Sequence, residues 1–177
     1  TVKLFFGGVN TANAEQKQLK DKSIEYLHMA IEEIRKLSKE LVTPQLKEEN
    51  LANNIKALIE DIQLAGILKL SFNHKVKDEL LSSGKKITLF RIVQEQLKNI
   101  IKHSKATATQ ISLYSTEDTI VLVMKDNGKG FDPRQTRQGI GLSNIHERAQ
   151  FYNGTAEVKS SSGAGCTLTV TIPVKEN

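Results

Sequence analysis

The stretch from Asp126 to Gly141 constrains the chain most, because it places a carboxylate and several glycines between two elements of regular structure. Residues 120–124 before it form an uninterrupted apolar run of strand length, and residues 143–152 after it have a helical pattern. A carboxylate that ends a buried strand is costly when unpaired, and glycine lets the backbone approach another group closely. The N–H groups that start the following helix favour an anion. A surface turn is the alternative interpretation, since Asp-Asn-Gly is a common turn sequence.

Length and composition indicate a globular protein with one core, or a small domain with an appendage. The 177 residues are 38% hydrophobic and 25% charged. No apolar run approaches the roughly 20 residues that cross a bilayer. Because Thr1 is not a natural start, we interpret the sequence as a fragment, and any membrane span would lie upstream of it. The single cysteine, Cys166, excludes an internal disulfide and suits a reducing compartment.

Positive charge is concentrated in the second part of the chain. Residues 63–177 carry 16 Lys+Arg and 10 Asp+Glu, whereas residues 1–62 carry 9 and 10. A basic region suggests an anionic partner, and a nucleotide satisfies that as well as a nucleic acid. Aromatic residues make up only 5% and are not interleaved with the basic ones. The sequence therefore argues against a nucleic-acid partner.

The first part of the chain, residues 1–62, has the pattern of helices with an apolar seam. Apolar residues recur every three or four positions, as in a helical bundle, and Thr43-Pro44 separates two such segments. Helices this narrow imply a partner surface, most simply a second copy. We therefore expect a domain boundary after residue 62 and a homodimer formed through residues ~15–62. The seam positions are Ile24, Leu27, Ile31, Ile34 and Leu41, then Leu51, Ile55, Leu58 and Ile62.

From Gly66 onward, strand and helix patterns alternate. Residues 85–103 have helical periodicity, and in residues 166–174 apolar residues alternate with Thr167, Thr169 and Thr171. Together these patterns predict about five strands in a mixed sheet with helices on one face, which is an α+β architecture. The other expected strands are residues 68–72, 111–113, 120–124 and 155–159.

Polar residues lie opposite the apolar stripe of the helix 85–103. Glu95, Asn99, Lys102 and His103 fall within an arc of about 100° if each residue turns the helix by about 100°. Glu95 and Asn99 are neighbours at i, i+4, and their oxygens can order a water or complete a magnesium shell made mainly of phosphate oxygens. Lys102 can supply positive charge to those phosphates. A solvated helix face fits these four residues equally well.

Two further segments contain residues that can bind a nucleobase. The carboxylate of Asp126 can accept a hydrogen bond from an exocyclic amino group such as that of adenine, and Gly128 and Gly130 leave room for the base and sugar. The segment Ser162–Thr167 is glycine-rich and precedes the last strand. It fits a hairpin turn, and Thr167 can also hydrogen-bond near the base.

Taken in order, these motifs resemble the Bergerat ATP-binding fold shared by gyrase, Hsp90, MutL and sensor histidine kinases. The resemblance covers residues ~66–174 and implies a two-layer α/β sandwich with a mixed sheet, preceded here by a remnant of a helical hairpin. Only eight residues, 131–138, separate the second and third motifs, and so short a lid resembles the kinases related to nitrate- and desaturase-regulating sensors. Residues 30–44 resemble the second dimerisation helix of that subfamily. The motifs are Glu95-xxx-Asn99-xx-Lys102-His103, Asp126-x-Gly128-x-Gly130, Gly139-x-Gly141-Leu142 and Gly163-x-Gly165-x-Thr167.

The resemblance implies ATP and Mg²⁺ as cofactors and assigns a role to each motif. Asn99 would coordinate Mg²⁺, Asp126 would bind the adenine amino group, and Lys102 and His103 would approach the phosphates. Cys166 stands where relatives often have Thr, so Thr167 is the expected residue near the base. The implied catalytic residues are Glu95 and Asn99, and the implied nucleotide contacts are Asn99, Lys102, His103, Asp126, Gly128, Gly130, Gly139, Gly141, Leu142 and Thr167.

The activity that this resemblance implies is phosphoryl transfer by a two-component sensor histidine kinase. The γ-phosphoryl group of ATP would pass to a histidine and then to the receiver domain of a response regulator, in the cytoplasm or in the cytoplasmic part of a membrane-bound sensor. Among the four histidines, only His146 is followed by an acidic residue, as the family's acceptor usually is, and it lies in the helix after the glycines. We therefore expect the acceptor to lie upstream of Thr1. The other three histidines are His28, His74 and His103.

Two alternatives remain open. In ATPases with this fold, a glutamate four residues before the magnesium-binding asparagine is the general base, and Glu95 has that spacing from Asn99. A nucleotide-binding regulator without catalytic activity is the other alternative. The helical segment before the nucleotide motifs favours the kinase.

Overall fold

The computed structural model describes residues 22–26, 50–132 and 140–175 of the chain. It contains two compact units, Thr1–Pro44 and Gln45–Asn177. In the first unit residues 22–26 are helical, in agreement with the pattern there, and the remainder of the expected first helix lies outside the described residues. Within the described part, no helix is long and apolar enough to cross a membrane.

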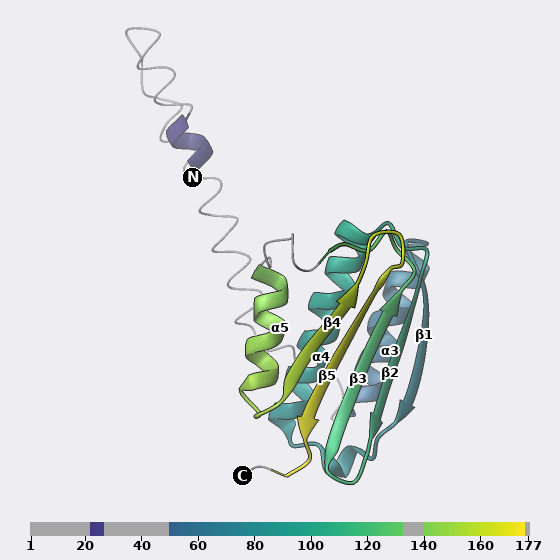
Figure 1. Cartoon of the computed structure of the whole chain (residues 1–177), viewed down its shortest axis with the longest axis vertical. Helices are drawn as coiled ribbons and strands as arrows, with labels where there is room; N and C mark the ends of the chain where they lie inside the picture. Colours follow the sequence, from purple (N-terminus) through teal and green to yellow (C-terminus); the bar gives the residue numbers. More distant parts are fainter. Residues whose placement is uncertain (1–21, 27–49, 133–139, 176–177) are drawn as a thin grey trace, which may run out of the picture. The chain divides into compact units, whose positions relative to one another are not determined.

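The described part of the second unit contains one mixed five-stranded sheet, as the alternation of strand and helix patterns predicts. The strands lie in the order β1-β2-β3-β5-β4 (Figure 1), and β1 is parallel to β2 while the other neighbours are antiparallel. The order makes β5 the neighbour of β3, so that Asp126 at the end of β3 pairs with Cys166 at the start of β5. The strands are β1 (Lys69–Lys75), β2 (Ala108–Ser115), β3 (Thr119–Asp126), β4 (Thr155–Ser160) and β5 (Cys166–Pro173).

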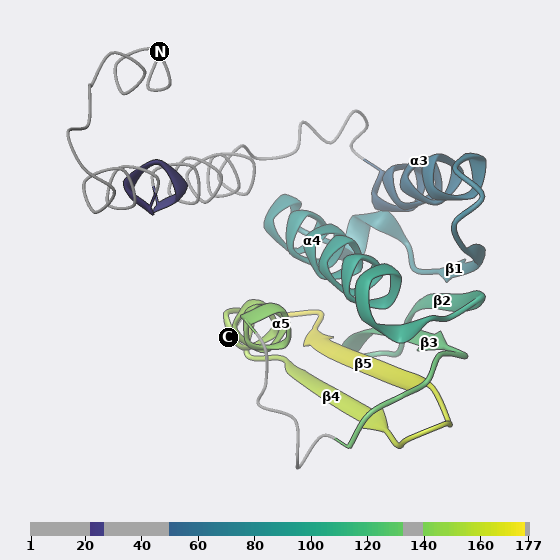
Figure 2. The same cartoon turned by 90° about the horizontal axis from the view of Figure 1, so that it is seen from above.

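Helices cover one face of this sheet (Figure 2). They are α3 (Leu51–Leu64) over β1, α4 (Ser83–Asn99) in the middle and α5 (Ile140–Gln150) over β4 and β5. Asn50 and Ser82 cap α3 and α4, each by accepting a backbone hydrogen bond from the residue three positions later. The sheet and its helices therefore form two layers, the α+β architecture expected from the sequence.

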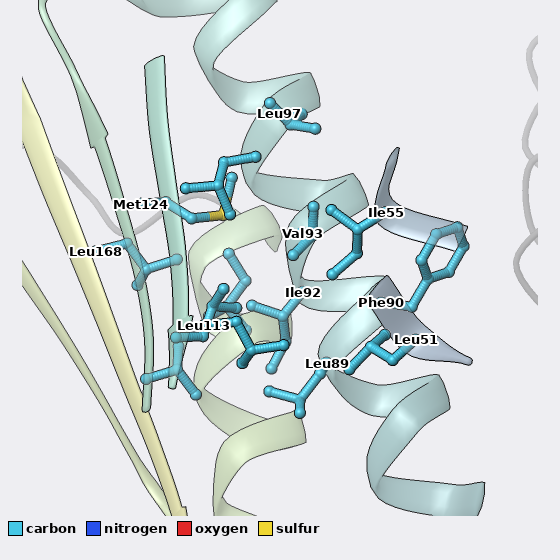
Figure 3. Packing of buried hydrophobic residues seen from close by; sticks show 14 of the residues in the cluster. Leu51, Ile55, Leu89, Phe90, Ile92, Val93, Leu97, Leu113, Met124 and Leu168 are labelled. Carbon is cyan, nitrogen blue, oxygen red and sulfur yellow. The ribbon is translucent and has the colours of Figure 1, made fainter. Parts of the chain in front are cut away.

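The core lies between the two layers. The strands alternate, so that Leu113, Met124 and Leu168 face the helices and are fully buried. Fully burying a side chain of this size stabilises the fold by about 1.5–3 kcal/mol. In Figure 3, Leu89, Ile92 and Val93 of α4 lie between the sheet residues Leu113, Met124 and Leu168 on one side and Leu51 and Ile55 of α3 on the other.

The helix α3 belongs to the same unit as the sheet. Leu51 and Ile55 on its apolar face are 0% exposed and join the core that α4 and β1 contribute to. The sequence placed the boundary after residue 62, whereas the compact unit begins at Gln45. The reason is that α3 buries its apolar stripe against α4 and β1. Dimerisation through residues ~15–62 stays a prediction.

Candidate functional site

The end of α4 differs from the continuous helix that the periodicity predicts. The α-helix ends at Asn99 and continues as a π-helical turn, Ile100–Ser104, which closes at Lys105 with a left-handed φ of 56°. A π-helical turn is wider than an α-helical one, so Lys102 and His103 lie on a turn of different geometry from that of Glu95 and Asn99. These two side chains are exposed on the π-helical turn.

Glu95 and Asn99 remain adjacent on the last turn of α4, and the start of α5 lies against them. A methyl group placed on Gly141 would lie 2.6 Å from Glu95 Oε1 and 3.0 Å from Asn99 Oδ1. Only glycine fits at such a separation without a shift of these side chains. Two of the expected motifs, far apart in sequence, therefore meet at one place.

The pair on α4 combines an amide nitrogen without a partner among the described residues and a carboxylate held by a neighbouring lysine. Asn99 Nδ2 is buried and has no hydrogen-bond partner within the described residues. Glu95 has a side chain that is 19% exposed and an ion pair to Lys98 at 3.4 Å. Among the described residues, no group of three or more His, Cys, Asp or Glu residues is placed to hold a metal ion. The oxygens present fit a magnesium ion held mainly by phosphate oxygens and water, to which the protein adds one or two donors.

The carboxylate of Asp126 lies at the end of β3, and the residue is only 3% exposed. Burial raises the pKa of Asp126 above its ordinary value, and hydrogen bonds from the backbone N–H groups of Gly128 and Cys166 partly oppose that shift. The bond from Gly128 N to Oδ1 is 2.8 Å long. No ion pair to Asp126 occurs among the described residues. Asp126 is thus a fixed and buried acceptor, as a group that recognises an amino group needs to be.

The loop after Asp126 is packed against the π-helical turn. Lys129 N donates a hydrogen bond to Ser104 O at 2.8 Å, and a methyl group on Gly128 would overlap the same oxygen. Asn127 ties the loop to the start of β2 by accepting hydrogen bonds from the backbone N–H groups of residues 107 and 108. The loop is therefore held by its neighbours on two sides.

The hairpin turn between β4 and β5 closes the third side of this loop. Gly130 has a φ of +61°, and its Cα faces the backbone of Ser161 so closely that a side chain would overlap it. Ser160 Oγ donates a hydrogen bond to Gly165 O at 2.8 Å and accepts one from Phe131 N at 3.0 Å. The glycines here are needed for close backbone contact within the protein.

The structure brings Cys166, and not Thr167, to Asp126. Along β5 the buried residues alternate with half-buried ones, and Cys166 shares the core-facing side with Leu168. Thr167 pairs with Lys125 and alternates with the core-facing residues of β5, so it lies on the other face of the sheet from Asp126, and its place near the base stays a prediction. In the sequence, Cys166 has the same alternation phase as the core residues of this strand, and this pattern indicated that it faces the core.

Thr109 is a buried neighbour of Asp126 that belongs to none of the sequence motifs. It lies directly opposite Asp126 on β2, is 3% exposed, and faces the helices with Ile111 and Leu113. Its hydroxyl has no partner within the described residues. Among the remaining expected residues, Leu142 packs against the core, and Gly139 lies outside the described residues.

The fold and site define a nucleotide-binding domain, and comparisons with known proteins agree. Residues 84–176 match the family described as histidine kinase-, DNA gyrase B- and HSP90-like ATPase. The sensor protein VraS of Staphylococcus saprophyticus is 32% identical over 98% of this chain and 52% of its own length. The signal transduction histidine-protein kinase/phosphatase UhpB of Salmonella typhimurium is 31% identical over 83% of this chain and 30% of its own length. The chain therefore spans about half or less of the length of these curated relatives.

A solved ATP-binding domain has a similar fold. The ATP-binding domain of PrrB from Mycobacterium tuberculosis superposes with a TM-score of 0.53 at 26% identity, over 64% of this chain and 85% of that one. The chain belongs to the histidine kinase-, DNA gyrase B- and HSP90-like ATPase family. It carries an ATP-binding domain of the kind found in sensor histidine kinases.

Proposed function

We propose that this domain binds Mg²⁺-ATP and transfers the γ-phosphoryl group to a histidine, as the catalytic domain of a two-component sensor histidine kinase. The observation that carries the proposal is the meeting of Glu95, Asn99 and Gly141 at the N-terminus of α5. The N-terminus of a helix attracts phosphate, and the oxygens of the pair on α4 suit a magnesium ion that phosphates also bind.

Asp126 would recognise the base. Its carboxylate is fixed by two backbone N–H groups and is buried, so a donor on the ligand meets a preorganised acceptor without competition from water. An adenine amino group supplies such a donor, and guanine presents a carbonyl oxygen at the same position of the ring. The site therefore favours ATP over GTP.

Asn99 would hold the metal ion by its side-chain oxygen, and the metal would neutralise charge on the transferring phosphoryl group. The backbone N–H groups at the start of α5 would bind the phosphates, with Gly141 permitting the close approach to Asn99. Lys102, which is exposed on the π-helical turn, would add positive charge near the phosphates, and His103 on the same turn would approach them. Most of the catalysis is then positioning and electrostatic stabilisation.

The acceptor is proposed to be a histidine outside the nucleotide-binding domain. His74 lies on β1 and His146 lies within α5, so both belong to the nucleotide-binding domain itself. We further propose that residues ~15–62 contribute to a homodimer, that the receiver domain of a response regulator takes the phosphoryl group, and that the domain works in the cytoplasm. The short segment 131–138 supports the subfamily of nitrate- and desaturase-sensor-like kinases.

An ATPase is the second candidate, because Glu95 Oε1 lies at the same place as Asn99 and Gly141. A carboxylate there can act as a general base that activates water for hydrolysis. In a kinase the same group would orient the imidazole or hold a water. The two candidates differ in where the γ-phosphate goes.

The test uses the full-length protein with γ-labelled ATP and magnesium, and compares wild type with Glu95→Gln. Protein-bound label that survives base but is lost in acid establishes phosphohistidine and a kinase. Free phosphate without labelled protein, strongly reduced in Glu95→Gln, establishes the ATPase instead. Absence of both products, with no ATP binding by calorimetry, would reject the nucleotide site altogether.

A further inference from the structure

Three of the four buried side-chain atoms without a hydrogen-bond partner in the described residues lie on the last turns of α4 or beside Asp126, and the fourth, on His74, lies farther along the sheet. Four side-chain atoms in the described residues are buried without a hydrogen-bond partner: His74 Nε2, Gln96 Oε1, Asn99 Nδ2 and Thr109 Oγ1. Gln96 and Asn99 lie on the last turns of α4, and Thr109 pairs with Asp126 across β2 and β3. A buried polar group without a partner is costly, so such a concentration points to a ligand or to water that a ligand orders.

Thr109 has the best-defined position of these residues. Asn127 N donates to Ala108 O, and hydrogen-bonded and non-hydrogen-bonded pairs alternate along an antiparallel ladder. Thr109 and Asp126 are consequently a non-hydrogen-bonded pair, in which side chains on the same face come close, with Cβ atoms about 4.5–5.5 Å apart. The side chains of Thr109 and Asp126 are therefore neighbours on one face of the sheet, and the Thr109 hydroxyl has no hydrogen-bond partner among the described residues.

The neighbour on the other side of Asp126 is a weaker hydrogen-bonding group. Cys166 pairs with Asp126 on β5, and its thiol already interacts with Ser160. Burial, and then the charge of Asp126, raise the pKa of Cys166 to about 11, so the sulfur stays a neutral thiol. A thiol is a poor donor and acceptor compared with a hydroxyl. Of the two residues that flank Asp126 on the sheet, Thr109 on β2 is therefore the stronger hydrogen-bonding group, and its hydroxyl has no partner among the described residues.

We propose that Thr109 is a second base-reading residue, whose hydroxyl and the Asp126 carboxylate together hold the amino edge of adenine, directly or through one shared water. This inference rests on the proposed function and adds a specificity residue to it. A valine at this position would have nearly the same shape and would lack the hydroxyl.

The experiment measures ATP affinity by calorimetry and thermal stability without nucleotide for wild type, Thr109→Val and Thr109→Ser. We expect Thr109→Val to weaken ATP binding about five- to tenfold, as the loss of one hydrogen bond does. We expect its melting temperature without nucleotide to be unchanged or higher, because the substitution removes an unpartnered buried hydroxyl. Thr109→Ser, which retains the hydroxyl, should bind ATP within about twofold of wild type.

A nucleotide without the amino group separates base reading from general effects. Purine riboside triphosphate should bind wild type less tightly than ATP, and Thr109→Val should reduce that difference. Equal ATP affinity in wild type and Thr109→Val, or an equal loss in Thr109→Val and Thr109→Ser, would overturn the role of Thr109. If wild type does not bind ATP, the proposed function itself fails, so the two failures are distinguishable.

Discussion

Replacement of Gly141 by alanine tests the central contact of the site. The added methyl group would lie 2.6 Å from Glu95 Oε1, 3.0 Å from Asn99 Oδ1 and 3.1 Å from Asn99 Nδ2. A real Cβ does not tolerate the first distance, so the carboxylate of Glu95 has to rotate away or the start of α5 has to move by several tenths of an ångström. Both responses disturb the Asn99 side chain that is proposed to hold the metal.

The effect on stability is expected to be small. Alanine in place of glycine stabilises a helix interior by about 0.8–1 kcal/mol, and less near a helix end. Forcing one side chain off its rotamer costs about 0.5–1.5 kcal/mol. These terms nearly cancel, so the melting temperature should change by no more than about 5 °C. The rate of phosphoryl transfer depends more steeply on the position of the reacting groups, and a misplacement of about 1 Å lowers a rate about 100-fold. We expect phosphoryl transfer to fall about 10- to 100-fold.

The assay combines γ-labelled ATP turnover, ATP affinity and thermal melting for Gly141→Ala, with Ser143→Ala on the same helix as the matched control. Ser143→Ala should behave as wild type. Because the nearest overlap is with Glu95, the loss of ATP affinity should shrink when Gly141→Ala is made in a Glu95→Ala background, a coupling that a double-mutant cycle measures. Wild-type affinity and turnover in Gly141→Ala would refute the argument that α5 meets α4 at the nucleotide site.

Three further predictions concern single residues. Asp126→Asn should abolish ATP binding while the protein stays folded, as calorimetry and circular dichroism would show; wild-type affinity would remove Asp126 from the site. Because burial raises the pKa of Asp126, the folded protein keeps this proton to a higher pH than the unfolded chain does. The stability gained from that proton is therefore lost as pH rises from the ordinary aspartate pKa through the raised one. Thermal melting across that window should show this loss in wild type and not in Asp126→Asn. Asn99→Ala should remove most of the magnesium dependence of ATP binding, and an unchanged dependence would place the metal elsewhere. Ile55→Ala should destabilise the unit that contains the sheet by about 2–5 kcal/mol in denaturant melts, because Ile55 is 0% exposed in its core; a negligible change would return α3 to a separate segment.

The strands and the main helices follow from local patterns. The alternation in residues 166–174 predicts β5, which spans Cys166–Pro173, and the apolar run 120–124 predicts β3, which spans Thr119–Asp126. These patterns are strong because one face of each strand packs on the same core, so a shift by one residue would expose it. The fold class was predictable for this reason.

Features that depend on contacts between distant segments were not predictable in the same way. The π-helical turn Ile100–Ser104 contains no proline or glycine that would mark it, and its end is fixed by contacts of Ser104 with the loop after Asp126. The packing of α3 on α4 and β1 was missed for a related reason. An apolar stripe indicates that a helix buries one face, but it does not say whether the partner is another chain or the adjoining sheet.

The position of Thr109 illustrates how a site can extend beyond its sequence motifs. Asp126 ends a motif that the sequence displays, but its neighbours on the sheet are decided by strand order, which brings β2 to one side and β5 to the other. Cys166 and Thr109 face the same side as Asp126 because the register pairs each of them directly with it. A sequence motif contains only residues close to Asp126 along the chain. A base bound at the carboxylate would also contact residues on the neighbouring strands. The hydroxyl of Thr109 is therefore the group through which recognition of the base by this chain is expected to depend on β2 as well as on the recognised motifs.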